Sequence, residues 1–137
     1  MSMNSPAQTP LRIGILGAAN IARQFTAALA PSKLVTVTAV ASRDLAKAES
    51  FAKECGIERA LGSYEAMLAD KEIDAIYIPL PNTLHAEWAI KAVEAGKHVL
   101  CEKPLATKAA DARAMFDAAK RHNVHLCLLY TSPSPRD

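Results

Sequence analysis

Residues 12–23, with the sequence RIGILGAANIAR, have the spacing of a turn that could bind a pyrophosphate. In the fingerprint G-x-G-x-x-G, glycines permit a tight turn, close approach of the backbone to the phosphates, and close packing of a helix on a strand. Here Gly17, Ala19 and Ala22 occupy the three glycine positions. Alanine still permits fairly close approach, so we interpret this segment as a phosphate-binding turn. A strand–helix turn without a ligand is the alternative.

The start of the helix after this turn would bind the phosphates through backbone N–H groups. A helix N-terminus has unpaired N–H groups and the positive end of the helix dipole, and both favour anions. The residues that we expect to contact the cofactor here are Gly17, Ala18, Ala19, Asn20 and Ile21.

The end of the next strand-like segment indicates which dinucleotide would bind. Enzymes that bind NAD usually have Asp or Glu there for the ribose 2′-hydroxyl, whereas arginine accommodates the 2′-phosphate of NADP. This chain has a hydroxyl at Ser42 and a planar guanidinium at Arg43, and Lys47 could add charge one turn into the following helix. We therefore predict NADP, while Asp44 leaves NAD possible. A solvated surface arginine is the alternative for Arg43.

Alternating strand-like and helix-like segments position these residues. Apolar and β-branched runs predict strands at 11–17, 34–42, 59–61, 74–80 and 97–102. Helical spacing of apolar residues predicts helices from Asn20 to Pro31, from Asp44 to Gly56, at 64–68, at 84–95 and after Thr107. Strands separated by helix-length segments imply βαβ units, so the expected fold class is α/β, a doubly wound parallel sheet of the Rossmann type.

Apolar spacing also predicts which side of each helix is buried. The predicted faces are Ile21, Phe25, Ala28 and Leu29 in the first helix, Leu45, Ala48, Ala52 and Cys55 in the second, and Ala112, Met115, Phe116 and Ala119 in the last.

The composition is that of an ordinary soluble globular protein and argues against several other classes of protein. The 137 residues are 50% hydrophobic and 22% charged, with a net charge of +2, and the basic residues are scattered among acidic ones, so we expect no nucleic-acid partner. Three cysteines, an odd number in apolar runs, favour reduced thiols and a cytoplasmic location. We predict no metal site, no signal peptide and no membrane span.

Four stretches together resemble the Gfo/Idh/MocA oxidoreductases. GILGAANIA, VASRD, GSYEAMLAD and IYIPLPNTLHAEWAIKAVEAGKHVLCEKPLA follow one another with that family's order and spacing, from about Leu11 to Val124. The most specific piece is the tripeptide Glu102-Lys103-Pro104. The stretches ASRD and IPLPN are most similar to the branch of NADP-linked xylose and dihydrodiol dehydrogenases.

This resemblance implies a catalytic role for Lys103. The matching lysine in the family contacts the nicotinamide ribose and the substrate hydroxyl and takes part in proton transfer. Burial beside a cationic nicotinamide would lower the pKa of such a lysine towards working pH. Glu102 would lie on the cofactor side. An exposed lysine at a strand end is the alternative for Lys103.

The resemblance also extends the cofactor site to the end of the fourth strand, where open α/β sheets bind ligands. Leu80, Pro81 and Asn82 would line the groove, with His85 near it and Tyr64 in its wall. The alternatives are a polar residue at a helix start for His85 and ordinary packing for Tyr64.

The resemblance also defines what is missing. Full-length relatives, which are often dimeric, carry a C-terminal α/β domain with the substrate pocket, and this domain is absent here. The chain instead ends in CLLYTSPSPRD, whose prolines do not suit a central strand. We therefore divide the chain into a disordered arm (1–10), a Rossmann domain (11–126) and a tail outside the family pattern (127–137). The tail comes from an artefactual reading frame, or the chain is a true short protein with a disordered tail.

The resulting hypothesis is an NADP-dependent oxidoreductase acting on a sugar, polyol or diol, represented by its cofactor half and inactive by itself. A nucleotide-binding module without catalysis and an interaction domain that has lost its ligand are the alternatives.

Overall fold

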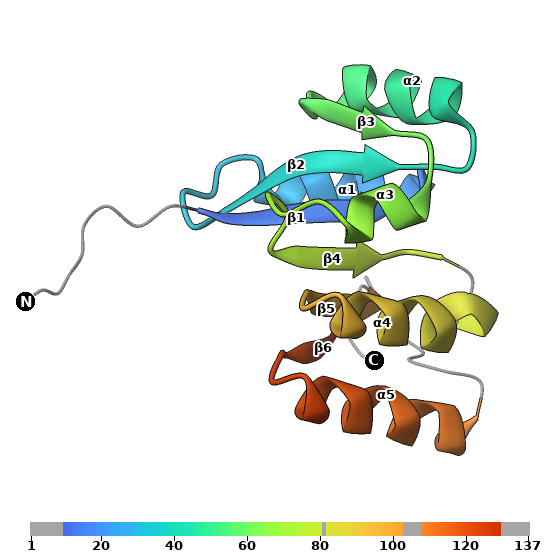
Figure 1. Cartoon of the computed structure of the whole chain (residues 1–137). Coiled ribbons are helices and arrows are strands. Elements are labelled where there is room, and N and C mark those ends of the chain that lie inside the picture. Colours follow the sequence, from blue (N-terminus) through green and yellow to red (C-terminus); the bar gives the residue numbers. More distant parts are fainter. Residues whose placement is uncertain (1–9, 81, 103–107, 130–137) are drawn as a thin grey trace, which may run out of the picture.

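A computed structural model describes residues 10–80, 82–102 and 108–129, which form one parallel sheet with helices on both faces (Figure 1). The six strands have the order β3-β2-β1-β4-β5-β6. Their bounds are β1 (Leu11–Leu16), β2 (Val35–Ala41), β3 (Arg59–Leu61), β4 (Ala75–Ile78), β5 (His98–Glu102) and β6 (Leu126–Leu129). The helices are α1 (Asn20–Leu29), α2 (Leu45–Cys55), α3 (Tyr64–Leu68), the 3-10 turn η1 (Asn82–Leu84), α4 (His85–Glu94) and α5 (Ala109–Arg121). The predicted doubly wound α/β fold is confirmed.

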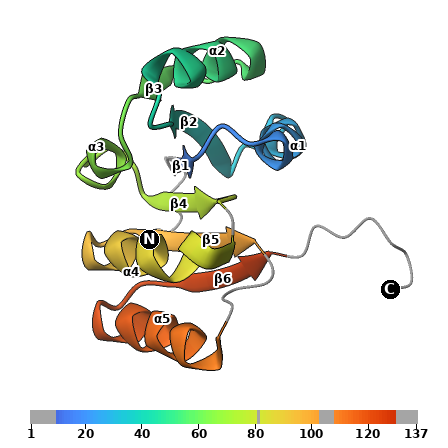
Figure 2. The ribbon, with the colours of Figure 1, turned by 90° about the vertical axis from the view of Figure 1, so that its right-hand side faces the viewer.

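The helices cover the two faces of the sheet unequally (Figure 2). One core cluster lies under α1 and α2 and includes Ile13, Val40 and Tyr77. The other lies under α3, α4 and α5 and includes Ile76 and Met115. Because β4 sends alternate side chains into both clusters, all four of its residues are buried. This explains why a central parallel strand appears in the sequence as a continuous apolar run.

The predicted ends of α2 are confirmed. The Asp44 carboxylate accepts a hydrogen bond from the backbone N–H of Ala46 at 3.0 Å, which caps the first turn. Gly56 ends the helix with a φ of 72°, in the left-handed conformation that glycine adopts without steric cost. The predicted cap of the last helix, Thr107, lies outside the described residues.

The predicted buried faces of three helices are confirmed in part. The core includes Ala48 and Ala52 of α2 and Met115 and Ala119 of α5, and Phe25 and Leu29 of α1 pack against it, as predicted. Other positions differ from the prediction. Ala28 is exposed and Ala22 is buried in α1. Leu45 and Phe116 are 47% and 49% exposed, whereas Phe51 in α2 and Ala118 in α5 are buried. These helices carry more apolar residues than their contact with the sheet can cover. The orientation of each helix on the sheet therefore decides which of them are buried. In α1 that contact selects a small residue, which permits close packing on the strands.

Strand β6 runs across the predicted boundary between the Rossmann domain (11–126) and the tail (127–137). Cys127, Leu128 and Leu129 pair with Leu100, Cys101 and Glu102 of β5. An apolar run suits a parallel strand, and the Ser-Pro segment begins only after it. Residues 130–137, and the arm before Pro10, lie outside the described residues. Among the described helices, none is long and apolar enough to cross a membrane.

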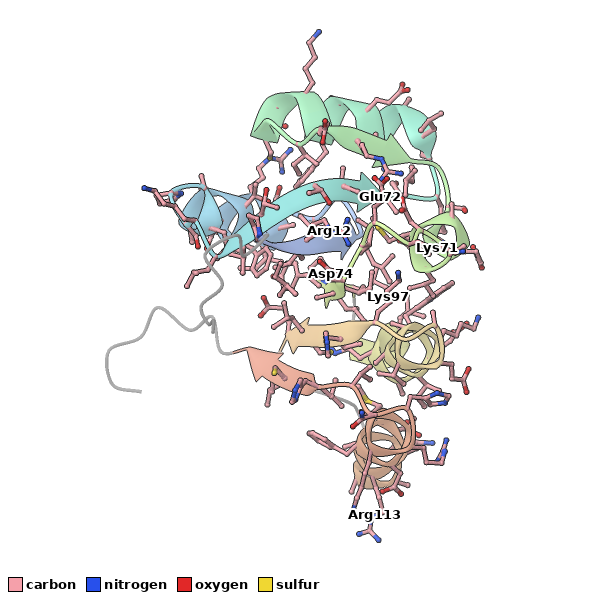
Figure 3. All side chains as sticks on the ribbon, turned by 60° about the vertical axis from the view of Figure 1, so that its left-hand side comes forward. Arg12, Lys71, Glu72, Asp74, Lys97 and Arg113 are labelled. Carbon is pink, nitrogen blue, oxygen red and sulfur yellow. The ribbon has the colours of Figure 1, made fainter. Side chains whose placement is uncertain are left out.

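Ion pairs and a buried lysine join the amino-terminal ends of the central strands (Figure 3). Arg12 donates two side-chain hydrogen bonds of 3.1 Å to the carboxylate of Asp74. Lys97 is 7% exposed, and its Nζ donates to the carbonyl oxygens of Ile73, at 2.7 Å, and Asp70. Burial lowers the pKa of Lys97, while Asp70 and Asp74 act in the opposite direction. These contacts hold the loops at the end of the sheet opposite to the predicted site.

Candidate functional site

The predicted site residues follow the carboxyl ends of neighbouring strands. Gly17 follows β1, Ser42 and Arg43 follow β2, Leu80 lies two residues after β4, and Glu102 ends β5. Because all strand pairs are parallel, these ends lie at one edge of the sheet. The chain moves outwards from β1 to β3 on one side and from β4 to β6 on the other. The edge is therefore at the topological switch point where open α/β sheets bind ligands.

The turn after β1 requires glycine at its first position. Gly17 has a φ of 116°, and a Cβ there would lie 3.0 Å from Cδ2 of Leu80. Its N–H donates to the carbonyl oxygen of Ala41 at 2.8 Å, which joins the turn to the end of β2. At the third fingerprint position, the Ala22 side chain is fully buried. Gly17 thus meets the requirement for a tight turn, and Ala22 meets the requirement for close packing of the helix on the strand.

The N-terminus of α1 lacks a side-chain cap. Ala19 has the extended backbone of an N-cap residue, with φ −98° and ψ 156°, but offers no acceptor to the N–H groups of the first turn. Uncapped N–H groups at a helix N-terminus can bind an anion.

The turn after β2 combines a buried serine with two exposed cations. Ser42 is buried, and its hydroxyl oxygen accepts a hydrogen bond from the N–H of Asp44 at 3.2 Å. Arg43 and Lys47 are exposed, and within the described part of the chain neither forms an ion pair. Lys47 also lines a shallow pocket between α1 and α2, shared with Ala18, Asn20, Arg23, Ser50, Phe51 and Glu54.

The sequence interpretation missed the role of Arg23 in this pocket. Its guanidinium donates to the Glu54 carboxylate at 3.1 and 2.8 Å, and its Nη1 donates to the side-chain oxygen of Asn20. It also lies 5.1 Å from the centre of the Phe51 ring. Arg23 therefore fixes Asn20 and joins α1 to α2. The spacing of three residues to Asn20 was visible in the sequence, but the partner on α2 was not.

His85 stabilises the chain after β4. Its side chain is 1% exposed, and its Nε2 lies 2.7 Å from the carbonyl oxygen of Leu80. A carbonyl can only accept, so Nε2 carries the proton in this contact. The structure therefore places His85 beneath the predicted groove, where it holds Leu80. Pro81 and the side chain of Asn82 lie outside the described residues.

Tyr64 begins α3, just beyond the end of β3, but its side chain belongs to the core. It is 8% exposed and packs edge-on against Trp88, with ring centroids 5.1 Å apart and planes at 85°. This contact agrees with the packing alternative for Tyr64, and its place in the groove wall stays a prediction.

The end of β5 carries a buried carboxylate. Glu102 is 8% exposed and accepts a hydrogen bond from the hydroxyl of Tyr77 on β4. Tyr77, which the sequence interpretation did not single out, is fully buried. Lys103, the predicted catalytic residue, follows directly in the chain but lies outside the described residues, as does Pro104.

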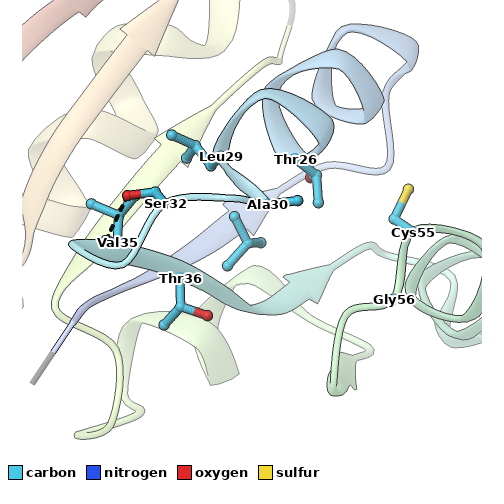
Figure 4. Close-up of a pocket in the computed structure, with 9 residues that line it drawn as sticks. Thr26, Leu29, Ala30, Ser32, Val35, Thr36, Cys55 and Gly56 are labelled. Carbon is cyan, nitrogen blue, oxygen red and sulfur yellow. Dashed lines mark hydrogen bonds between the residues drawn. The ribbon is translucent and has the colours of Figure 1, made fainter.

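A second pocket lies at the opposite end of the sheet (Figure 4). It is bounded by the end of α1, the start of β2 and the end of α2, with Leu29, Val35 and Cys55 in its lining. None of its nine lining residues is a predicted site residue. This pocket lies at the amino-terminal ends of the strands, whereas the switch point lies at their carboxyl ends.

Comparison with known proteins agrees with this arrangement. The family described as "Oxidoreductase family, NAD-binding Rossmann fold" (GFO_IDH_MocA) matches residues 11–130. D-xylose 1-dehydrogenase (NADP(+)) 2 of Haloferax volcanii is 47% identical over 116 residues, which are 85% of this chain and 36% of that protein. Trans-1,2-dihydrobenzene-1,2-diol dehydrogenase of Danio rerio is 42% identical over 118 residues, which are 85% of this chain and 35% of that protein.

Solved structures show the same likeness. The structure of KijD10, a 3-ketoreductase from Actinomadura kijaniata, in complex with NADP superposes with a TM-score of 0.83 at 41% identity. The match covers 88% of this chain and 38% of that one. The chain thus spans little more than a third of the length of the relatives that it matches.

Proposed function

Because the chain belongs to the Gfo/Idh/MocA oxidoreductase family, we propose that it is the cofactor-binding half of an NADP-dependent oxidoreductase. When bound, the nicotinamide would accept or supply a hydride at a CH–OH carbon of a sugar, polyol or diol. The observation that carries this proposal is the edge at the switch point. There an uncapped helix N-terminus, a turn that excludes a side chain at Gly17, and two cations without ion pairs among the described residues lie together.

The residues at this edge fit a dinucleotide. The positive φ of Gly17 and its lack of a side chain permit the tight turn packed on Leu80 that a pyrophosphate-binding loop needs, and the first turn of α1, at Asn20 and Ile21, would donate N–H groups to the pyrophosphate. Gly17, Ala18 and Ala19 would form the bend over which the phosphates lie. Leu80 would close the other side of the turn, since its side chain already contacts the Gly17 position.

The proposed preference for NADP depends on the turn after β2. Arg43 would bind the 2′-phosphate through its guanidinium, and Lys47 would add charge from the first turn of α2. Ser42 shapes this turn through its bond to Asp44, and its hydroxyl proton could still be donated to the phosphate. NAD, with no phosphate at this position, would gain little from either cation.

Lys103 is the proposed proton-transfer residue. In the sequence it directly follows Glu102, which ends β5 at the same edge of the sheet as the turn after β1. Its neutral amine would accept the hydroxyl proton during oxidation, and the ammonium would return a proton during reduction. The chain spans little more than a third of its relatives' length, and we propose that residues corresponding to the rest of that length would hold the substrate.

The proposed function is tested by binding and turnover assays on the 137-residue chain. NADPH fluorescence should report binding, and competition with NADP and NAD should show at least about a tenfold preference for NADP, equivalent to about 1.4 kcal/mol. No NADPH should form with aldoses, inositols or dihydrodiols, because positioning of the reacting carbon contributes effective molarities of about 10⁵ M or more.

Two results would contradict this proposal. Absence of binding to either dinucleotide would support an interaction domain that has lost its ligand. Steady turnover that disappears in Lys103→Ala would show that the Rossmann half assembles a complete site, so that the substrate would not depend on a second domain.

A further inference from the structure

Tyr77 and Glu102 form a buried polar pair that cofactor binding as proposed above leaves unused. Tyr77 is fully buried on β4 and pairs in register with Leu100 of β5. Side chains alternate along a strand, so Glu102, two residues after Leu100, lies on the same face of the sheet as Tyr77. The Tyr77 hydroxyl donates a hydrogen bond to Oε2 of Glu102. A hydroxyl and a carboxylate are costly to bury, so a pair at this depth requires an explanation.

The pair is joined to the phosphate-binding turn through α1. The ring of Phe25, on α1, stacks on the ring of Tyr77 with centroids 3.8 Å apart and planes at 13°. Phe25 belongs to the helix that begins at the turn, and its ring contacts the pair. A continuous line of packed groups connects the turn, α1, Tyr77 and the end of β5.

Tyr77 is the hydrogen-bond donor to Glu102 at neutral pH. Burial, followed by the hydrogen bond to Glu102, raises the pKa of its phenol far above the ordinary value of 10.0. The phenol therefore keeps its proton, and the Glu102 carboxylate accepts the hydrogen bond from one fixed direction.

The strand order places this pair under one half of a bound dinucleotide. With the pyrophosphate at the turn after β1 and the 2′-phosphate at the turn after β2, the adenosine half lies on the β2 side. The nicotinamide half must extend to the other side of β1, over β4 and β5. Glu102 ends β5 there.

We propose that Tyr77 is a positioning residue for the nicotinamide half of the cofactor, acting through the carboxylate of Glu102. This proposal rests on the proposed function, because it needs a dinucleotide at the carboxyl edge. Tyr77 holds the carboxylate, and with it the end of β5 from which Lys103 continues, in one orientation relative to α1. Without the phenol hydroxyl, the carboxylate would lose this hydrogen bond and the nicotinamide half would meet a less well-oriented surface.

The test compares two ligands in Tyr77→Phe, which keeps the ring stacked on Phe25 and removes only the hydroxyl. NADPH contains both halves of the cofactor, whereas 2′,5′-ADP contains only the adenosine half and the 2′-phosphate. The Kd for NADPH should rise about fivefold, as expected for the loss of one hydrogen bond worth about 1 kcal/mol. The Kd for 2′,5′-ADP should change less than twofold.

Two further variants separate positioning from general stability. Met115→Ala removes a buried side chain from the opposite core cluster, so it should lower the melting temperature and leave both Kd values unchanged. Glu102→Ala should reproduce the selective loss for NADPH, even if Tyr77→Phe does not fold. In the double variant, the loss should equal that of Glu102→Ala alone, because Tyr77 acts through Glu102.

The outcomes distinguish this inference from the proposed function. If the wild-type chain binds neither ligand, the proposed function fails. Suppose that the wild-type chain binds both ligands. If Tyr77→Phe and Glu102→Ala then raise the Kd values for NADPH and 2′,5′-ADP equally, or raise neither, the positioning role is overturned and the proposed function is not. Additive losses in the double variant would also overturn the positioning role.

Discussion

The two ends of the sheet use charged residues in opposite ways. At the amino-terminal end, Arg12 pairs with Asp74, Arg59 pairs with Asp70, and Lys97 donates to two carbonyl oxygens. At the carboxyl end, Arg43 and Lys47 are exposed and have no carboxylate partner within the described ranges. The same residue types are thus satisfied internally at one end and available to a ligand at the other.

This difference indicates which end stabilises the fold and which end binds. A buried cation whose protein partners are complete contributes to stability, and removing it leaves its acceptors unsatisfied. An exposed cation without a partner contributes little to stability and can be neutralised by a phosphate. Substitutions at the amino-terminal end should therefore change unfolding without changing affinity, and substitutions at the carboxyl end should do the reverse.

The largest effect is expected for Lys97→Met at the amino-terminal end. The substitution keeps the apolar stem but removes the hydrogen bonds to the carbonyls of Ile73 and Asp70. The free energy of unfolding in urea should fall by about 2–3 kcal/mol, with the Kd for NADPH unchanged. Lys71→Met, at an exposed lysine at the same end of the sheet with no ion pair among the described residues, is the matched control and should cost less than about 0.5 kcal/mol. A loss of NADPH affinity in Lys97→Met would break the comparison between the two ends.

At the carboxyl end, Arg43→Ala should weaken NADP binding about tenfold, or about 1.4 kcal/mol, and leave NAD affinity nearly unchanged. Competition against NADPH fluorescence measures both constants. Arg113→Ala, at an exposed arginine of α5, should change neither. Equal loss for NADP and NAD would mean that Arg43 holds the loop rather than the 2′-phosphate.

A smaller, pH-dependent effect is expected for Asp74→Asn. Hydrogen bonds from Arg12 hold the pKa of Asp74 below its ordinary value of 3.8. In acid the unfolded chain therefore binds this proton more readily than the folded protein does. The stabilisation is present above the ordinary pKa and is lost as the pH falls through the folded pKa.

Urea unfolding from neutral pH down to about pH 3 checks this prediction. The wild-type protein should be more stable than Asp74→Asn near neutrality, and the difference should shrink towards the acid end. Asp117→Asn, at an exposed aspartate of α5, should follow the wild type throughout. A difference that stays constant with pH would show that the ionic part of the pair contributes nothing.

The smallest effect is expected for Lys47→Ala. A single exposed ammonium beside the turn should contribute about threefold to NADP affinity, or roughly 0.6 kcal/mol, and the contribution should vanish in high salt. Lys53→Ala, at the far end of α2, is the control. A salt-insensitive loss would point to packing of the lysine stem instead of charge.

The sequence by itself determined the order of the elements from β1 to α5 and the location of the candidate site, but it did not predict β6, whose residues it assigned mostly to the tail. Apolar periodicity, Asp44 and Gly56 as the ends of α2, and the strand–turn–helix pattern around Gly17 are local properties, and the structure agrees with them. Parallel strands then require their carboxyl ends to lie at one edge, so the chain positions of Ser42 and Glu102 already indicated a common site.

Only the tertiary structure decided which side chains meet. Tyr77 and Glu102 are 25 residues apart, Arg23 and Glu54 are 31 apart, and Lys97 lies 24 residues after Ile73. The tertiary structure also buried Tyr64 and His85, which the family resemblance had placed in the groove wall and near the groove. Helical and strand periodicities define the faces of one element. Contacts between elements depend on strand register and helix placement, which arise only when the whole sheet assembles.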